Sequence, residues 1–196
     1  MQKNIAMEQK GRSMIEMLGV LAIVGVLSVA GIAGYSKAMG KFKINKAMDQ
    51  VSTLSSNIKT MYANAGSYKT VSNSEAISLT LFPEEMTKGC TISNGVASDA
   101  STCVRSGING QVTIDKGDDN GNTFTVKFDA VSKDACTAFA SGEWGGSSGF
   151  SGLAIGTGDS ALVSITSSTK TSDIFSATAK CASCAAGSCS ATWTFL

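Results

Sequence analysis

The stretch MLGVLAIVGVLSVAGIAGYS, residues 17–36, decides the fold of this chain. Its twenty positions include no charged residue and are dominated by leucine, valine, isoleucine, alanine and glycine. At about 1.5 Å per residue, a helix of this length just spans a hydrocarbon core of about 30 Å. The stretch predicts a helix that enters a membrane, with three interpretations open: a permanent anchor, a secretory signal core, or an anchor that is later extracted.

The helical pattern continues beyond this apolar stretch. Apolar residues spaced by three or four positions form one stripe: Ile44, Met48, Val51, Leu54, Ile58, Met61 and Ala65. The polar residues between them are expected to face water or another subunit: Lys46, Asp49, Gln50, Ser52, Ser56, Asn57 and Lys59. Gly66 is a suitable stop because glycine tolerates the left-handed conformation at a helix C-terminus. We predict one helix over residues 12–65, apolar all round in its first half and on one side in its second.

Residues 66–196 are predicted to form a head of strands and loops, since small polar residues alternate there with apolar ones. Six strands are expected, over residues 77–82, 111–115, 123–128, 153–155, 161–166 and 191–195. The segment KGDDNGN, residues 116–122, is predicted to be a hairpin turn with Asn120 and Gly121 at its tip. The fold class is therefore α+β, with a long N-terminal helix packed by its second half on an antiparallel sheet.

The acidic residues of this turn have a second interpretation. Asp115, Asp118, Asp119 and Asn120 are clustered oxygen ligands of the kind that calcium prefers. Their spacing does not match an EF-hand, and no glutamate closes the loop. We therefore expect a plain turn and no metal site.

All six cysteines lie in the predicted head: Cys90, Cys103, Cys136, Cys181, Cys184 and Cys189. An even number confined to one region favours disulfides formed in an oxidising compartment. Six cysteines allow fifteen pairings, of which we expect Cys90 with Cys103, and Cys136 with Cys181 or Cys189. The alternative is a thiol oxidoreductase that uses the closely spaced Cys181 and Cys184.

The composition argues against most enzymes and against nucleic-acid binding. The chain has no histidine, which excludes a histidine base or histidine metal ligand and leaves the many serines without their usual catalytic partner. Residues 12–65 contain six basic and two acidic residues, whereas residues 66–196 contain eight basic and twelve acidic ones. The head is thus net acidic, and we predict neither an enzyme, nor a cofactor, nor a nucleic-acid partner.

The orientation in the membrane follows from the cysteines, because lysines flank the apolar stretch on both sides. Disulfides need the C-terminal part outside the cytoplasm, so the N-terminus is expected inside. Lys37, Lys41, Lys43 and Lys46 then contact lipid head groups or a neighbouring subunit. A secreted binding protein released by signal-peptide cleavage after Ala33 is the alternative, since Gly31 and Ala33 are small residues at the spacing that a signal peptidase requires.

The segment KGRSMIEMLGVLAIVGVL, residues 10–27, resembles the N-terminal signature of type IV pilins and their pseudopilin relatives. In that family a prepilin peptidase cuts after a glycine and methylates the new terminal amine, and a glutamate follows inside the apolar helix. The resemblance implies cleavage after Gly11, N-methylation of Arg12 and an assembly role for Glu16. It covers about residues 10–65, and only its first part is specific.

The resemblance also implies a domain organisation and a set of partners. Residues 1–11 would be the leader, residues 12–65 the helix with 17–36 in the membrane before assembly, and residues 66–196 the extracellular head. The partners would be other copies of the chain in a helical homopolymer, the peptidase, the inner membrane and its assembly platform. A major pilin of a filament for adhesion, aggregation, motility, DNA uptake or conjugation is favoured, and a minor pilin or type II secretion pseudopilin is the alternative.

A physical argument for Glu16 is independent of the resemblance. A carboxylate at the bilayer centre costs about 2.5 to 3.5 kcal/mol or more, so such residues are usually paired and functional. In a stack of staggered helices, Glu16 of one subunit can reach the new amine at Arg12 of the next. The structural alternative is a carboxylate that reaches the membrane surface at a helix N-terminus, where the dipole favours negative charge.

The chain departs from the usual pilin pattern in two ways. Many relatives begin the mature chain with phenylalanine or methionine, whereas this one would begin with Arg12. The apolar helix also lacks proline, and its glycines lower the helix propensity instead; they are Gly19, Gly25, Gly31 and Gly34. We predict that part of this helix loosens in the filament. The short leader, the absent proline and the cysteine-bearing head favour the b-type class.

Overall fold

The computed structural model describes residues 14–144, 149–158, 160–166, 168–169 and 171–196. The chain divides into two compact units, Met1–Phe42 and Lys43–Leu196. The boundary between the units lies within the first helix.

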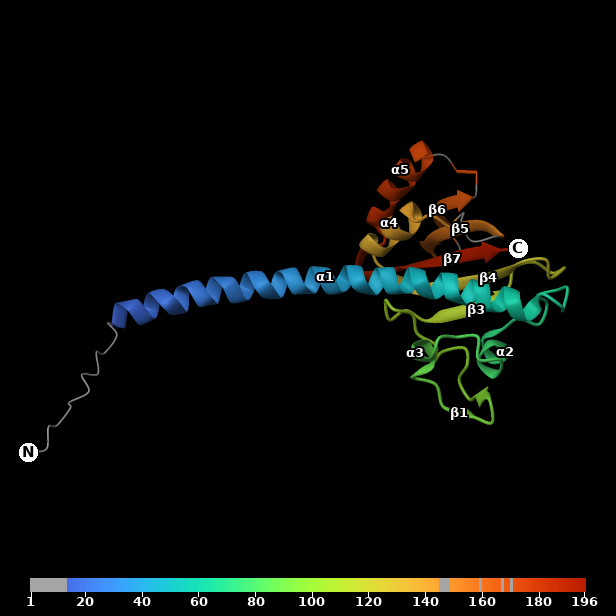
Figure 1. The fold of residues 1–196 in the computed structure, drawn as a ribbon. Coiled ribbons are helices and arrows are strands. Elements are labelled where there is room, and N and C mark those ends of the chain that lie inside the picture. Colours follow the sequence, from blue (N-terminus) through green and yellow to red (C-terminus); the bar gives the residue numbers. More distant parts are fainter. Residues whose placement is uncertain (1–13, 145–148, 159, 167, 170) are drawn as a thin grey trace, which may run out of the picture. The chain divides into compact units, whose positions relative to one another are not determined.

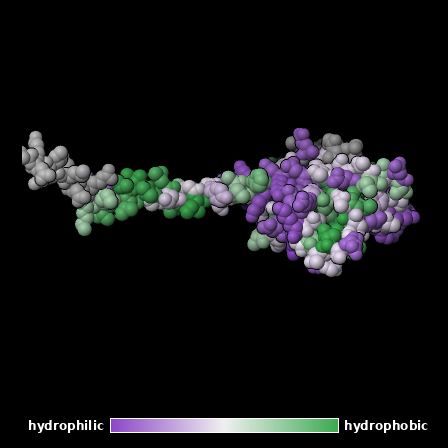
Figure 2. Space-filling model, turned by 60° about the horizontal axis from the view of Figure 1, so that its bottom comes forward, coloured by the Kyte–Doolittle hydropathy of each residue, from purple (hydrophilic) through white to green (hydrophobic). Residues whose placement is uncertain are grey.

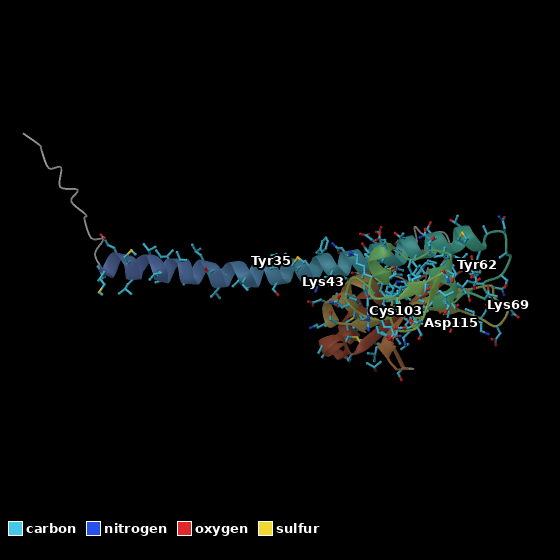
Figure 3. The ribbon with its side chains drawn as sticks, turned by 90° about the horizontal axis from the view of Figure 1, so that it is seen from below. Tyr35, Lys43, Tyr62, Lys69, Cys103 and Asp115 are labelled. Carbon is cyan, nitrogen blue, oxygen red and sulfur yellow. A yellow bond between two sulfur atoms is a disulfide. The ribbon has the colours of Figure 1, made fainter. Side chains whose placement is uncertain are left out.

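Helix α1, Met14–Tyr62, is 49 residues long and passes through both units. Between residues 14 and 42 all of its side chains are exposed except that of Met39, which is half-buried. Figure 2 shows the resulting hydrophobic surface over this stretch, and Tyr35, labelled in Figure 3, is 68% exposed. This is the one described helix long and apolar enough to cross a membrane.

The second half of α1 has a buried side, as predicted, but its membership differs from the predicted stripe. The buried residues are Ile44, Ala47, Gln50, Val51, Leu54, Ser55, Ile58 and Tyr62. Met61 and Ala65 were expected in the stripe and are exposed, whereas Gln50 was expected to face water and is buried. A prediction from hydrophobicity alone places Met61 on the buried side. It leaves out Gln50, a polar side chain that is buried because it forms hydrogen bonds there.

The helix ends three residues earlier than predicted, at Tyr62. A turn follows in which the amide of Ala65 donates a hydrogen bond to the Tyr62 carbonyl at 2.9 Å. Gly66 then has a φ of 66°, the left-handed conformation expected of it.

A five-stranded antiparallel sheet forms the centre of the second unit, in the order β3-β4-β7-β5-β6. The strands are β3 (Val112–Lys116), β4 (Phe124–Val131), β5 (Phe150–Thr157), β6 (Ser160–Thr166) and β7 (Cys189–Phe195). The last strand in the chain, β7, thus lies in the middle, while β3 and β6 are the two edges (Figure 1). These strands correspond to five of the six predicted ones, and the predicted α+β class is confirmed.

Alternating side chains of β4 and β7 supply the core of the sheet. Trp193 on β7 is fully buried, and its ring packs edge-on against Phe128 of β4. The same ring contacts Phe139 of helix α4 (Lys133–Ser141) and Trp144 beyond it. The second half of α1 joins this core through Tyr62, whose ring lies 5.6 Å from that of Tyr68, itself 4.8 Å from Phe124.

The sixth predicted strand, residues 77–82, is wrong. Its first residues belong to helix α2 (Asn73–Ser78), which begins at an N-cap where Ser72 accepts a hydrogen bond from the Glu75 amide. A serine followed three residues later by glutamate is a helix start signal, and it prevails over the apolar alternation. A one-turn helix α3 (Glu84–Thr87) follows directly after Pro83.

The remaining elements are short. They are the two-residue strands β1 (Ile92–Ser93) and β2 (Val96–Ala97), helix α5 (Thr171–Lys180), and the 3-10 turns η1 (Cys181–Ser183) and η2 (Ala185–Gly187). The predicted hairpin turn at 116–122 does join β3 to β4. Within it Asp118 accepts hydrogen bonds from the amides of Asn122 and Thr123 at 2.7 and 3.2 Å, so this carboxylate stabilises the turn.

Candidate assembly site and its connection to the head

Glu16 lies in the first turn of α1. Its neighbours are exposed apolar side chains, among them Met14 at 85%, Ile15 at 76% and Leu18 at 62%. A carboxylate in the first turn is stabilised by the positive end of the helix dipole. The next charged residue along α1 is Lys37, so Glu16 is one acid at the start of a long apolar surface.

Gly11 and Arg12, the predicted cleavage and methylation positions, lie outside the described residues. The cut after Gly11, the methylation of Arg12 and the division into leader, helix and head stay predictions.

Of the four lysines that follow the apolar stretch, Lys37, Lys41 and Lys43 are exposed. Lys46 differs, because its Nζ lies 3.2 Å from Oε1 of Glu85 on α3. Both side chains are more than a third exposed, so this pair by itself contributes little stability.

Gln50 turns this pair into a buried connection between α1 and the head. Its Nε2 donates to Glu85 Oε1 at 2.7 Å, and its Oε1 accepts from the amide of Gly107 at 2.7 Å. The hydrogen bond from Gln50, helped by Lys46, holds the pKa of Glu85 below its usual value. One amide side chain, only 4% exposed, thereby joins α1 to two separate segments of the head.

The segment around Gly107 approaches α1 closely. A Cβ added at Gly107 would lie 3.0 Å from the carbonyl oxygen of Lys43 and 3.1 Å from the amide nitrogen of Ala47. These are backbone atoms of α1, which have little freedom to move. Glycine is therefore needed here for the contact that lets the Gly107 amide reach Gln50.

A second buried amide, Asn73, holds the outer edge of the sheet. Its Nδ2 donates to the carbonyls of Ala100 and Val112, both at 2.8 Å, and its Oδ1 accepts from the Ile114 amide at 2.7 Å. All three partners are backbone groups, and two belong to β3. Asn73 therefore acts on β3 as a neighbouring strand would.

The six cysteines form three disulfides: Cys90–Cys103, Cys136–Cys181 and Cys184–Cys189. The first pair and the first of the two options for Cys136 are as predicted. Cys181 and Cys184 are bonded to different partners and both are fully buried. The alternative that these two form a redox-active pair is therefore wrong.

Comparison with known protein families tests the resemblance noted at the N-terminus. A family model described as PilS N terminal matches residues 41–195. This chain belongs to the PilS family of type IV pilins. The match lies entirely outside residues 10–27, which carried the resemblance, so two separate parts of the pilin lead to the same family. As a pilin it is a structural protein and not an enzyme.

Two solved structures are similar to this pilin. One is the type IV b pilin from Salmonella typhi, with 22% identity and a TM-score of 0.49, covering 76% of this chain and 96% of that one. The other is TcpA, a type IV pilin from Vibrio cholerae El Tor biotype, with 10% identity and a TM-score of 0.46, covering 79% and 99%. No curated protein sequence matches the pilin.

The sequence missed the two amides, Gln50 and Asn73, that connect the elements of the head. For Gln50 the sequence contains one usable signal: it lies three residues after Ala47 and four before Leu54, on the buried side of the helix. For Asn73 no signal was available, because its partners are 27 to 41 residues away.

Proposed function

We propose that this pilin is the major structural subunit of a type IV pilus, made as a precursor with a leader over residues 1–11 and polymerised through α1. The observation that carries the proposal is the exposed apolar surface of α1 over residues 17–36, which follows directly after Glu16. Apolar surface of this extent is stable only in lipid or against other copies of the helix. A membrane before assembly and a filament afterwards supply these two environments in turn.

In the assembled filament, Glu16 of one subunit would accept the amine freed at Arg12 of a neighbour. Residues 12 and 16 are one helical turn apart within a chain, so a neighbour staggered along the axis brings the two charges together. In apolar surroundings a subunit in the wrong register leaves two charges poorly compensated, at a cost of several kcal/mol. The pair thus selects the axial register of the filament.

The precursor would cross the inner membrane once, with its N-terminus in the cytoplasm and residues 17–36 in the bilayer. Three disulfides in the second unit support an outside location for the head. The partners would be the prepilin peptidase, the assembly platform of the inner membrane and further copies of the pilin. The disulfide-bonded head favours the b-type class.

The test is replacement of Glu16 in the cell that makes the pilus. Glu16→Ala and Glu16→Val are expected to insert into the membrane as wild type does, but to form no filaments. Ser28→Ala is a matched control within the same apolar helix, because the Ser28 hydroxyl is satisfied by the carbonyl of Val24 at 2.8 Å. Normal filament yield from either Glu16 variant would end the proposed role.

Mass spectrometry of sheared filaments tests the processing. The expected mature chain begins at Arg12 with one methyl group on its amine and contains three disulfides. A chain that begins at Gly34 would instead be a secreted protein cut after Ala33. A chain that begins at Arg12 but is scarce in sheared filaments would be a minor pilin or pseudopilin.

The glycines within the apolar stretch, residues 17–36, lead to one further expectation for the filament. Gly19, Gly25, Gly31 and Gly34 have no atom within 4 Å of an added Cβ, so no contact within the subunit requires glycine at these positions. We expect part of residues 17–36 to lose helical order when subunits pack together. A filament density map with continuous helix through this stretch would contradict the expectation.

A further inference from the structure

The two edge strands of the five-stranded sheet, β3 and β6, differ in whether their outward-facing backbone groups are hydrogen-bonded. On the β3 edge, Asn73 binds the outward carbonyl of Val112 and the outward amide of Ile114, and the Val112 amide donates to the Val104 carbonyl at 3.0 Å. Arg105 forms a further bridge to Gln111 just before the strand. The β3 edge is therefore already paired.

Among the described residues, no strand pairs with β6 on the side away from β5. At its end, the Thr166 amide donates to Thr169 Oγ1 at 2.7 Å and the Thr166 carbonyl accepts from the Thr169 amide at 3.0 Å. The backbone groups of Thr166 thus point away from β5, and by the alternation of antiparallel strands those of Ser164 do too. Among the described residues, the Ser164 backbone has no hydrogen-bond partner beyond the β5–β6 pairing.

The β6 edge also lacks the features that usually protect an edge strand. Natural edges carry lysine, proline or inward charges that prevent another strand from joining. The segment SALVSIT of β6 contains no charged residue and no proline. Ser160, Ala161, Ser164 and Thr166 are exposed, although α5 contacts this strand.

We propose that β6 is an interaction surface that takes the β6 strand of a second copy of this pilin, in antiparallel pairing. β3 is closed, β4, β5 and β7 are interior, and β1 and β2 are two residues each, too short for a ladder. Among the described strands, β6 of another copy is the partner that remains. This inference rests on the proposed function, because polymerisation brings many copies together.

Symmetry determines where the second copy lies. Neighbours within one helical filament are related by rotation with translation, so they meet through two different surfaces. A β6–β6 pair uses the same surface twice and is related by a two-fold axis. The two copies therefore belong to different filaments, and the β6 edge joins filaments side by side.

The test uses purified filaments of full-length pilin, compared by low-speed sedimentation and electron microscopy. Ser164→Lys places a charge on the edge, and Ser164→Pro removes only the outward amide, which makes no bond within the sheet. Thr102→Lys is the control, because it adds the same charge at an exposed residue outside the sheet. Wild type and Thr102→Lys are expected to bundle, whereas both Ser164 variants should form single filaments and sediment several-fold less.

A second measurement needs no variant. Hydrogen exchange of the β6 amides in wild-type filaments should slow several-fold when single filaments are concentrated into bundles, while exchange of β4 stays constant. Bundling of both Ser164 variants at the wild-type level, wild-type filaments that stay single, or unchanged β6 exchange would each overturn the proposal. A wild-type chain that forms no filaments at all would instead contradict the proposed function.

Discussion

Replacing Gln50 with leucine should release α1 from two segments of the head at once. Leucine keeps most of the volume but leaves the Gly107 amide without its acceptor, and an unsatisfied buried donor costs about 1 to 3 kcal/mol. The lost bond to Glu85 adds less, because that carboxylate is 39% exposed and water replaces the amide. Allowing for the apolar surface that leucine buries, we expect a loss of about 2 kcal/mol in the free energy of unfolding.

The assay is equilibrium urea unfolding of the full-length pilin in detergent with its disulfides intact, followed by the fluorescence of buried Trp144 and Trp193. Thr53→Leu is the matched control, since Thr53 is exposed on the same helix, and its effect should stay within about 0.5 kcal/mol. A Gln50→Leu variant no less stable than this control would refute the role of Gln50 as the connection.

The pH dependence of the same variant tests the mechanism. Because the pKa of Glu85 is lowered in the folded pilin, its carboxylate adds stability above the usual value of 4.5, and this stability is lost as the pH falls through the folded pKa. The principal cause is the hydrogen bond from Gln50. The difference between wild type and Gln50→Leu should therefore shrink below pH 4.5, and a constant difference would contradict the assignment.

Three further predictions concern the head. Gly107→Ala should lower the free energy of unfolding by about 1 to 3 kcal/mol, because the added Cβ lies 3.0 Å from the backbone of α1. Gly40→Ala is the control, since nothing lies within 4 Å of its added Cβ, and it should not destabilise the pilin in a thermal unfolding comparison. Removing Cys136–Cys181, whose cysteines are 45 residues apart, should lower the free energy of unfolding by about 4 kcal/mol, and removing Cys184–Cys189, with a separation of 5, by about 2 kcal/mol. Urea unfolding of the two double-alanine variants measures the difference, and equal losses would argue against a loop-entropy origin. A chain of residues 43–196 should keep the unfolding free energy of the full-length head within about 1 kcal/mol, since every buried residue of α1 lies at or after Ile44; an unfolded fragment in circular dichroism would contradict this.

The sequence predicted those features that depend on neighbours along the chain. The two-part character of α1, the left-handed Gly66 and the 116–122 turn all follow from local spacing. Cys90–Cys103 was also accessible, because a separation of 13 residues favours a local loop. In each case the physical cause acts within a few helical turns or one hairpin.

The sequence failed where a distant segment decides the outcome. Gln50 is buried because Glu85 and Gly107 supply a hydrogen-bond acceptor and a donor, and a helical pattern contains neither. Glu16 could be proposed as a candidate site because the sequence signal is itself a conflict, an acid beside twenty uncharged and mostly apolar residues. Buried amides such as Gln50 present no such conflict, since glutamine is common on exposed helix faces.

The central position of β7 explains why the strand order could not be predicted from the sequence. It also constrains how the head folds. Residues 189–195 are the last strand in the chain, yet they pair with both β4 and β5, which have no pairing with each other. Until the C-terminus is in place, the sheet consists of two separate hairpins, β3–β4 and β5–β6.

Each disulfide joins cysteines that are consecutive in the sequence, so none requires β7 to be paired first. Cys136–Cys181 then holds the ends of a segment that contains β5 and β6 close to α4, which follows β4 directly. Closing that loop lowers the entropy cost of inserting β7 between the two hairpins, because their separation is already restricted.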